Sequence, residues 1–125
     1  MADSRDSKVS CIDVSILDGI RALQNEGEAD ILTELINMYL KDSKAHMERV
    51  SLAFSHKDAA LLRRSLHSLK GISGNMGATR FSNYCYELNG QLDQHATFEG
   101  LEGWLPKLQQ EYEQVYEALS AERNV

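Results

Sequence analysis

The chain has 125 residues, a formal net charge of −6 at pH 7, and 42% hydrophobic residues. This length fits one domain that can bury a hydrophobic core, and the composition is that of a soluble globular protein. The acidic balance argues against a general nucleic-acid binder, and no apolar run approaches the roughly 20 residues that span a bilayer.

The N-terminal residues 1–12 are predicted to form a polar tail ahead of a single domain at residues 13–122. The tail lacks the apolar stretch of a signal peptide. Cys11 and Cys85 stand far apart and form no CxxC motif, so free thiols in a reducing compartment are expected. We therefore expect a cytoplasmic protein.

The first predicted helix is short and covers about residues 14–24, with Asp13 as its N-cap and Gly27 as its stop signal. Its apolar residues share one side: Ile16, Leu17, Ile20 and Leu23. A longer helix is predicted at about 28–54, where apolar residues recur at intervals of three and four. These residues are Leu32, Leu35, Ile36, Tyr39, Met47, Val50 and Phe54.

The third predicted helix covers about residues 59–76, with Ser55 or Asp58 available as its cap, and the fourth covers about residues 78–94. The residues expected to face the core are Leu62, Ser65, Leu66, Leu69, Ile72, Ser73 and Met76 in the third helix. In the fourth helix they are Phe81, Tyr84, Cys85, Leu88 and Leu92.

The last helical pattern covers residues 101–119 and contains the only proline of the chain, Pro106. Its inward residues are Leu101, Leu105, Leu108, Tyr112, Val115 and Leu119. Because proline clashes with the preceding helical turn, we expect either a kink or a helix that starts near Leu105. One short and four long amphipathic helices predict an all-α fold, an antiparallel four-helix bundle with a short additional N-terminal helix.

The third helix carries a histidine that a helical wheel places opposite the core-facing residues. Arg63, Arg64 and Lys70 lie within one turn of His67, although the chain is acidic as a whole. A lone helical histidine is more often structural or solvated than reactive. Here, however, a neutral imidazole is a nucleophile near pH 7, and the neighbouring cations are expected to keep the ring neutral because they disfavour its protonation. The same cations would donate charge-assisted hydrogen bonds to a phosphoryl group on the ring, and the site is predicted to be locally basic.

Two glycines, Gly71 and Gly74, follow on the same predicted helix face as His67. Each costs about 1 kcal/mol of helix propensity relative to alanine. Glycine within a helix is useful where a partner must approach the backbone closely. We therefore predict that both glycines clear space beside the histidine. The alternatives are a weak run at the helix end, together with Gly77, or close packing between helices.

The stretch that begins at His67 resembles the signature of histidine-containing phosphotransfer (HPt) domains, which are intermediate carriers in phosphorelays. The residues that match the family pattern are His67, Leu69, Lys70, Gly71, Ser73 and Gly77, with Ala78 following. The family fold, an antiparallel four-helix bundle, fits the predicted helices. The resemblance implies that His67 accepts and donates a phosphoryl group, that Lys70 steadies this group, and that Gly71 makes room for a docking partner.

The resemblance also implies an amide from the next helix that hydrogen-bonds the histidine, for which Asn89 is the first candidate and Gln91 the second. The implied partners are response-regulator receiver domains, whose acidic pocket holds Mg²⁺ and an acceptor aspartate, and a hybrid sensor histidine kinase upstream. The chain itself is expected to be a monomer, to bind no cofactor, metal or ATP, and to be no enzyme. The residues expected to dock the partner are Arg63, Arg64, Gly71, Gly74, Ile31 and Met38.

Three other functions compete with this interpretation. An independent kinase is disfavoured because the chain has no P-loop and no Gly-rich nucleotide signature. A di-iron or zinc bundle is disfavoured because Glu-x-x-His pairs and HExxH are absent. A helical interaction module without phosphoryl chemistry remains the main alternative. Acid-labile phosphorylation would separate this module from a phosphotransfer domain.

Overall fold

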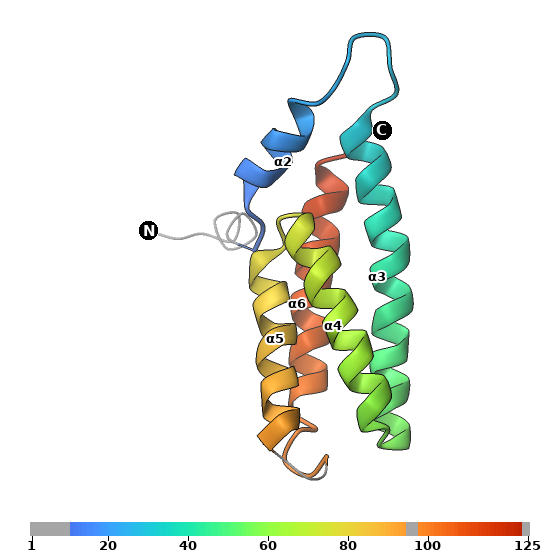
Figure 1. The fold of residues 1–125 in the computed structure, drawn as a ribbon, viewed down its shortest axis with the longest axis vertical. Coiled ribbons are helices and arrows are strands. Elements are labelled where there is room, and N and C mark those ends of the chain that lie inside the picture. The colour runs from blue at the N-terminus through green and yellow to red at the C-terminus, as the bar shows by residue number, and fades with distance from the viewer. Residues whose placement is uncertain (1–10, 95–97, 124–125) are drawn as a thin grey trace.

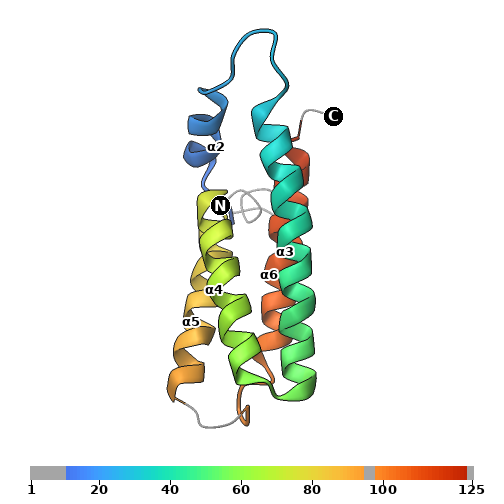
Figure 2. The ribbon, with the colours of Figure 1, turned by 45° about the vertical axis from the view of Figure 1, so that its right-hand side comes forward.

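The computed structural model describes residues 11–94 and 98–123. Within these residues the helices are α2 (Val14–Arg21), α3 (Ile31–His56), α4 (Ala59–Asn75), α5 (Thr79–Gln94) and α6 (Trp104–Ala121). The four long helices run alongside one another in alternating directions, and α2 lies at the end of the bundle where α3 begins (Figures 1 and 2). The predicted all-α bundle with a short additional N-terminal helix is confirmed. No described helix is long and apolar enough to cross a membrane.

Aspartate side chains begin three of the helices. Asp13 caps α2, Asp30 caps α3 and Asp58 caps α4. Each carboxylate accepts a hydrogen bond from a backbone N–H group of the first turn that has no acceptor inside the helix. The acceptor distances are 3.0 Å, 3.1 Å and 3.0 Å respectively. The cap of α4 is thus Asp58 rather than Ser55. A carboxylate is favoured at these positions because the N-terminal end of a helix carries partial positive charge.

The connection between α2 and α3 differs from the prediction. Helix α2 ends at Arg21, short of the predicted end near residue 24, and Leu23 lies beyond it with 65% of its surface exposed, so the apolar side of this helix does not extend to Leu23. The side chain of Gln24 holds the connection together by donating to the carbonyls of Glu28 and Ala29 and accepting from the N–H of Ile31. These polar contacts compete with helix continuation.

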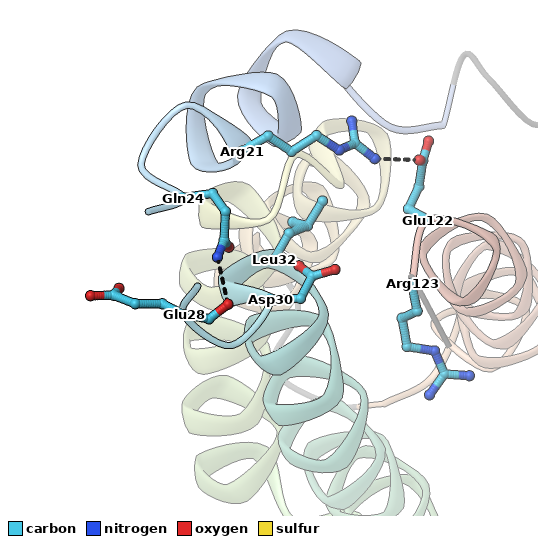
Figure 3. A pocket seen from close by; sticks show the side chains of 7 residues that line it. All are labelled: Arg21, Gln24, Glu28, Asp30, Leu32, Glu122 and Arg123. Atoms are coloured by element: carbon cyan, nitrogen blue, oxygen red, sulfur yellow. Dashed lines mark hydrogen bonds and ion pairs between the residues drawn. The ribbon is translucent and has the colours of Figure 1, made fainter. Parts of the chain in front are cut away.

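Helix α2 is also tied to the far end of the chain, across a pocket that Figure 3 shows from close by. The guanidinium of Arg21 donates to the carboxylate of Glu122 at 2.7 Å, and Arg123 donates to Asn37 of α3 at 2.8 Å. The end of α6 is thereby joined to both α2 and α3.

Helix α6 begins at Trp104, which places Pro106 in its first turn. Backbone N–H groups in the first turn have no intrahelical acceptor, so a proline there removes no hydrogen bond. Of the two outcomes expected at Pro106, a kink or a helix that starts near Leu105, the second is observed.

The bundle core contains most of the residues expected to face inward. Phe81, Cys85 and Leu88 of α5 are fully buried, whereas Tyr84 is half-buried. The other fully buried side chains of the long helices include Ile36, Val50, Leu62, Leu66, Leu69, Leu108, Val115 and Leu119. Two hydrogen bonds cross this core. The hydroxyls of Tyr39 and Ser73 lie 2.8 Å apart and join α3 to α4, and those of Ser43 and Tyr112 lie 2.7 Å apart and join α3 to α6.

The turn between α4 and α5 requires a glycine. Gly77 has a φ of +80°, and a Cβ there would lie 2.8 Å from the carbonyl oxygen of Asp13. The N–H of Asp13 in turn donates to the carbonyl of Gly77 at 2.6 Å. This close approach places the start of α2 against the α4–α5 turn and fixes where α4 ends.

Candidate functional site

The candidate histidine lies in the middle of α4, on the side turned away from the core. His67 is exposed, whereas the adjacent Leu66 and the nearby Leu69 are fully buried. Beside it, an open groove of about 710 Å³ separates the outer faces of α4 and α5. The residues that line the groove are Arg63, Arg64, His67, Ser68, Lys70, Tyr86, Glu87, Asn89, Gly90 and Asp93. Five of the eight site residues predicted on α4 and α5 line this groove, namely Arg63, Arg64, His67, Lys70 and Asn89, and α5 forms its second wall.

Lys70 lies one helical turn after His67 and contacts an aromatic ring from the neighbouring helix. Its ammonium nitrogen is 4.8 Å from the centre of the Tyr86 ring, within the range of a cation–π interaction. Tyr86 itself is 62% exposed. The predicted phosphate-stabilising lysine thus shares a groove with His67 and rests on a surface tyrosine.

The charge of the groove is more balanced than predicted. Arg63, Arg64 and Lys70 come from α4, but Glu87 and Asp93 of α5 line the same groove. Arg63 forms an ion pair with Asp93, and both side chains are substantially exposed. Arg64 forms no ion pair with any residue in the described part of the chain. The formal charge of the groove residues is therefore +1 with histidine counted as neutral, so the site is locally basic as predicted but contains acids that the prediction did not include.

Of the two amides considered as partners of the histidine, Asn89 is the one in the groove. Its side-chain carbonyl oxygen is buried and accepts no hydrogen bond from the described residues. Gln91 is half-buried and does not line the groove. A buried oxygen without a donor is costly, so Asn89 offers an unused acceptor in the groove that His67 also lines. An imidazole N–H is a donor of the required kind.

The two glycines predicted to face outward lie in different surroundings. Gly71 is exposed, and a Cβ built on it would meet nothing within 4 Å. Gly74 is half-buried, and a Cβ there would lie 3.6 Å from Oγ of Ser82, which donates to the carbonyl of Lys70 at 2.8 Å. The open face therefore includes Gly71 but not Gly74. Gly74 fits the alternative of close packing between helices, because it lies against the first turn of α5.

The two apolar residues proposed for docking lie on α3, outside the groove. Met38 is 59% exposed, and Ile31 is half-buried at the first position of the helix. Neither lines the groove around His67. Their contribution to docking stays a prediction.

Sequence reasoning missed the residues that α5 contributes to the groove, in particular Tyr86, Glu87 and Asp93. One signal was available for Tyr86, since it falls outside the core stripe of its helix and is therefore an aromatic residue directed to solvent. Nothing in the sequence indicated that Asp93 would meet Arg63, because that contact depends on how α5 is rotated against α4.

The described residues include no group of three or more His, Cys, Asp or Glu side chains placed to hold a metal ion. The chemistry available in the groove is that of an exposed imidazole with a neighbouring ammonium, a free guanidinium and an amide acceptor. These groups suit a nucleophilic nitrogen that binds an anionic group. The fold and the site together define a helical bundle that presents an exposed histidine in a groove shared with a lysine.

Comparison with known proteins identifies the family. The family model described as "Hpt domain" matches residues 34–118, more than half of the chain. The chain therefore belongs to the Hpt domain family, and the resemblance drawn from the sequence is confirmed. All of the groove residues fall within the matched range.

Two curated relatives come from Arabidopsis thaliana. Histidine-containing phosphotransfer protein 5 is 29% identical over 94 residues, which cover 73% of this chain and 57% of that protein. Histidine-containing phosphotransfer protein 1 is 26% identical over 95 residues, which cover 74% of this chain and 61% of that protein. The matched part of the chain thus spans about three-fifths of the length of these relatives.

A solved structure has the same fold. The crystal structure of histidine-containing phosphotransfer protein B (HptB) from Pseudomonas aeruginosa PAO1 superposes with a TM-score of 0.78 and 24% sequence identity. The superposition covers 90% of this chain and 94% of that one. It supports the bundle architecture of the chain independently of the sequence matches.

Proposed function

We propose that the chain is a phosphorelay intermediate that accepts a phosphoryl group on His67 from a receiver-domain aspartate and passes it to another receiver domain. The observation that carries this proposal is the exposure of His67 in a groove shared with Lys70, within a chain of the Hpt family. The role follows from the site because transfer between two proteins needs an imidazole that a partner can reach.

The proposed transfer uses the ring nitrogen that is distal to the backbone. This nitrogen forms a bond to phosphorus as the bond from phosphorus to the receiver carboxylate oxygen breaks, and that bond's electron pair stays on the carboxylate. The other ring nitrogen keeps its proton and donates it in a hydrogen bond to the carbonyl of Asn89. The ammonium of Lys70 donates to the phosphoryl oxygens, where charge-assisted hydrogen bonds are strongest. The reverse reaction returns the group to a second receiver.

The proposed partners are receiver domains, whose acidic pocket would hold Mg²⁺ beside the aspartate, and a hybrid sensor kinase that supplies the group. Gly71 supports this docking because no side chain rises above the helix at that point. Arg64 would meet the acidic pocket, and Ile31 and Met38 would add apolar contacts. The chain would act as a monomer in the cytoplasm and would need no cofactor, metal or ATP of its own.

Label transfer from a phosphorylated receiver domain tests the proposal. Receiver domains from the organism that encodes the chain would be phosphorylated with a small-molecule phosphodonor and mixed with three forms of the chain: wild type, His67→Gln and His56→Gln. The matched control is His56→Gln, because His56 is an exposed histidine at the end of α3, outside the groove. We expect label on the wild type and on the control, and none on His67→Gln.

Each form should keep the same helical circular dichroism, because both substitutions are at exposed positions. Full labelling of a folded His67→Gln chain would contradict the proposal. Failure of every receiver domain to label the wild type would favour the alternative of an interaction module.

A further inference from the structure

A surface tyrosine of α5 lies against the lysine that is proposed to steady the phosphoryl group. The Lys70 ammonium nitrogen lies 4.8 Å from the centre of the Tyr86 ring. Both residues line the groove that contains His67. Because Tyr86 is 62% exposed, its place in the groove is not explained by burial in the core.

A lysine side chain on a helix surface samples many rotamers, and fixing one of them costs conformational entropy. An aromatic face attracts an ammonium group and so restricts these rotamers. Lys70 follows His67 by three positions, a spacing at which side chains on one helix are neighbours. The Tyr86 ring therefore favours those Lys70 conformations that keep the positive charge in the groove.

The contact leaves the lysine able to act. An ammonium has three N–H donors, so one can point at the ring while the others donate to phosphoryl oxygens. The ring has no charge of its own and does not compete with a phosphoryl group for the cation, as a carboxylate would. Arg63 is the contrasting case, because its guanidinium is already paired with Asp93.

We propose that Tyr86 is a positioning residue that holds Lys70 beside His67 and so promotes phosphorylation of the imidazole. This inference rests on the proposed function, because it assigns to Lys70 the role of steadying the phosphoryl group. At an exposed site a cation–π interaction contributes about 0.5–1 kcal/mol, which corresponds to a roughly two- to fivefold effect on rate.

The test uses phosphoramidate, a small donor that bypasses any receiver domain. The imidazole nitrogen forms a bond to phosphorus as the phosphorus–nitrogen bond of the reagent breaks, and ammonia leaves with a proton from the medium. Intact-mass spectrometry follows the rate of labelling, and peptide mapping assigns the label to His67. The variants are Tyr86→Ala, Tyr86→Leu, Tyr86→Phe, Lys70→Ala and the double variant Lys70→Ala/Tyr86→Ala.

We expect Tyr86→Ala and Tyr86→Leu to slow labelling of His67 by roughly two- to fivefold, and Tyr86→Phe to restore the wild-type rate because the ring remains. In the Lys70→Ala background, removing Tyr86 should cause no further slowing, since the ring would have no cation to hold. Tyr116→Ala is the matched control, because Tyr116 is an exposed tyrosine on α6 that does not line the groove. It should label at the wild-type rate.

An unchanged rate in Tyr86→Ala, or equal slowing by Tyr86→Ala in the presence and absence of Lys70, would overturn the positioning role and leave the proposed function intact. A wild-type rate in Tyr86→Leu would also overturn it, because bulk would then suffice. A wild-type chain that phosphoramidate labels at His67, but that no phosphorylated receiver domain labels, would instead count against the proposed function alone.

Discussion

At position 67 the bundle exposes an imidazole on a helix face where Lys70 and Gly71 follow within about one turn. The side chain of His67 is exposed to solvent, whereas Leu66 and Leu69 of the same helix are buried in the core. The imidazole is thus accessible, while its helix is packed against the core. Such a combination suits transfer between proteins, in which a partner must reach the ring in a defined orientation.

Substitution of Gly71 tests the space beside the histidine. We expect Gly71→Gln to slow transfer from a phosphorylated receiver domain by at least tenfold, because a long side chain would stand where the partner approaches. Gly71→Ala is the control, since a Cβ there meets nothing within 4 Å. It should transfer at nearly the wild-type rate. Rapid-quench measurement of transfer gives both rates, and equal rates for Gly71→Gln and the wild type would contradict the docking role of this glycine.

Asn89 provides a second test at the level of single residues. We expect Asn89→Ala to slow labelling of His67 because the ring loses the acceptor that would fix its orientation and tautomer. Asn83→Ala is a control on the same helix, since Asn83 is exposed and does not line the groove. Phosphoramidate labelling measures both variants without a partner. An Asn89→Ala chain that is labelled as fast as Asn83→Ala would show that the amide does not position the ring.

The residues of α4 that carry the site could be predicted from the sequence, because they share one helix and their relative positions follow from its 3.6-residue period. His67, Lys70 and Gly71 are exposed as expected. Gly74 could not be predicted in the same way, because its exposure depends on where the first turn of α5 passes. Tyr86 and Asp93 were missed because the groove is formed by two helices, and periodicity orients each helix toward the core without showing which outer residues of the two helices meet.

At the level of elements, the α4–α5 turn determines how the two walls of the groove meet. Gly77 ends α4 in a left-handed conformation and allows Asp13 to approach the turn. The helices themselves were predicted within a few residues because their apolar periodicity and aspartate caps are local signals. The end of α2 was less predictable, since Gln24 forms hydrogen bonds with residues up to seven positions away.

Alanine substitution compares Gly77, which the turn requires, with Gly71, which lies in open space on a helix. We expect Gly77→Ala to lower the free energy of unfolding by about 1–3 kcal/mol, because its φ of +80° strains any side chain and a Cβ would lie 2.8 Å from Asp13. Gly71→Ala should raise it by up to about 1 kcal/mol, because alanine is the better helix former and the space is open. Urea denaturation followed by circular dichroism measures both. Equal stabilities for the two variants would contradict this account of the turn.

For the whole molecule, the net charge of −6 describes the surface in bulk and not the groove. The groove has an excess of one positive charge, because Glu87 and Asp93 offset two of its three cations. The sequence could predict the sign of this local charge but not its size, since the acids belong to a different helix. An acidic partner is therefore attracted less strongly than three unopposed cations would imply.

Burial in the core makes the stability of the whole bundle depend on pH in alkaline solution. Burial raises the pKa of the Cys85 thiol from 9.0 to about 12, and it also raises the pKa values of Tyr39 and Tyr112. The folded state therefore keeps protons that the unfolded state loses. The stabilisation from Cys85 is complete below pH 9 and is lost as the pH rises toward 12, at up to about 1.4 kcal/mol per pH unit.

We expect urea denaturation to give a lower free energy of unfolding at pH 10.5 than at pH 8. The Cys85→Ala variant removes one of the groups and creates a cavity, so it should be less stable than the wild type at pH 8. It should nevertheless lose less stability between the two pH values. A loss equal to that of the wild type would show that the Cys85 thiol does not contribute to the alkaline transition.

The central claim is that His67 carries the phosphoryl group, and the position and chemistry of the label test it most directly. The measurement is peptide mapping of the wild-type chain after transfer from a phosphorylated receiver domain, with samples held in mild acid or in alkali before analysis. The account predicts a single label on His67 that is lost in acid and kept in alkali, as expected for a phosphorus–nitrogen bond. A label that survives acid and maps to Ser65 or Ser68 would contradict it.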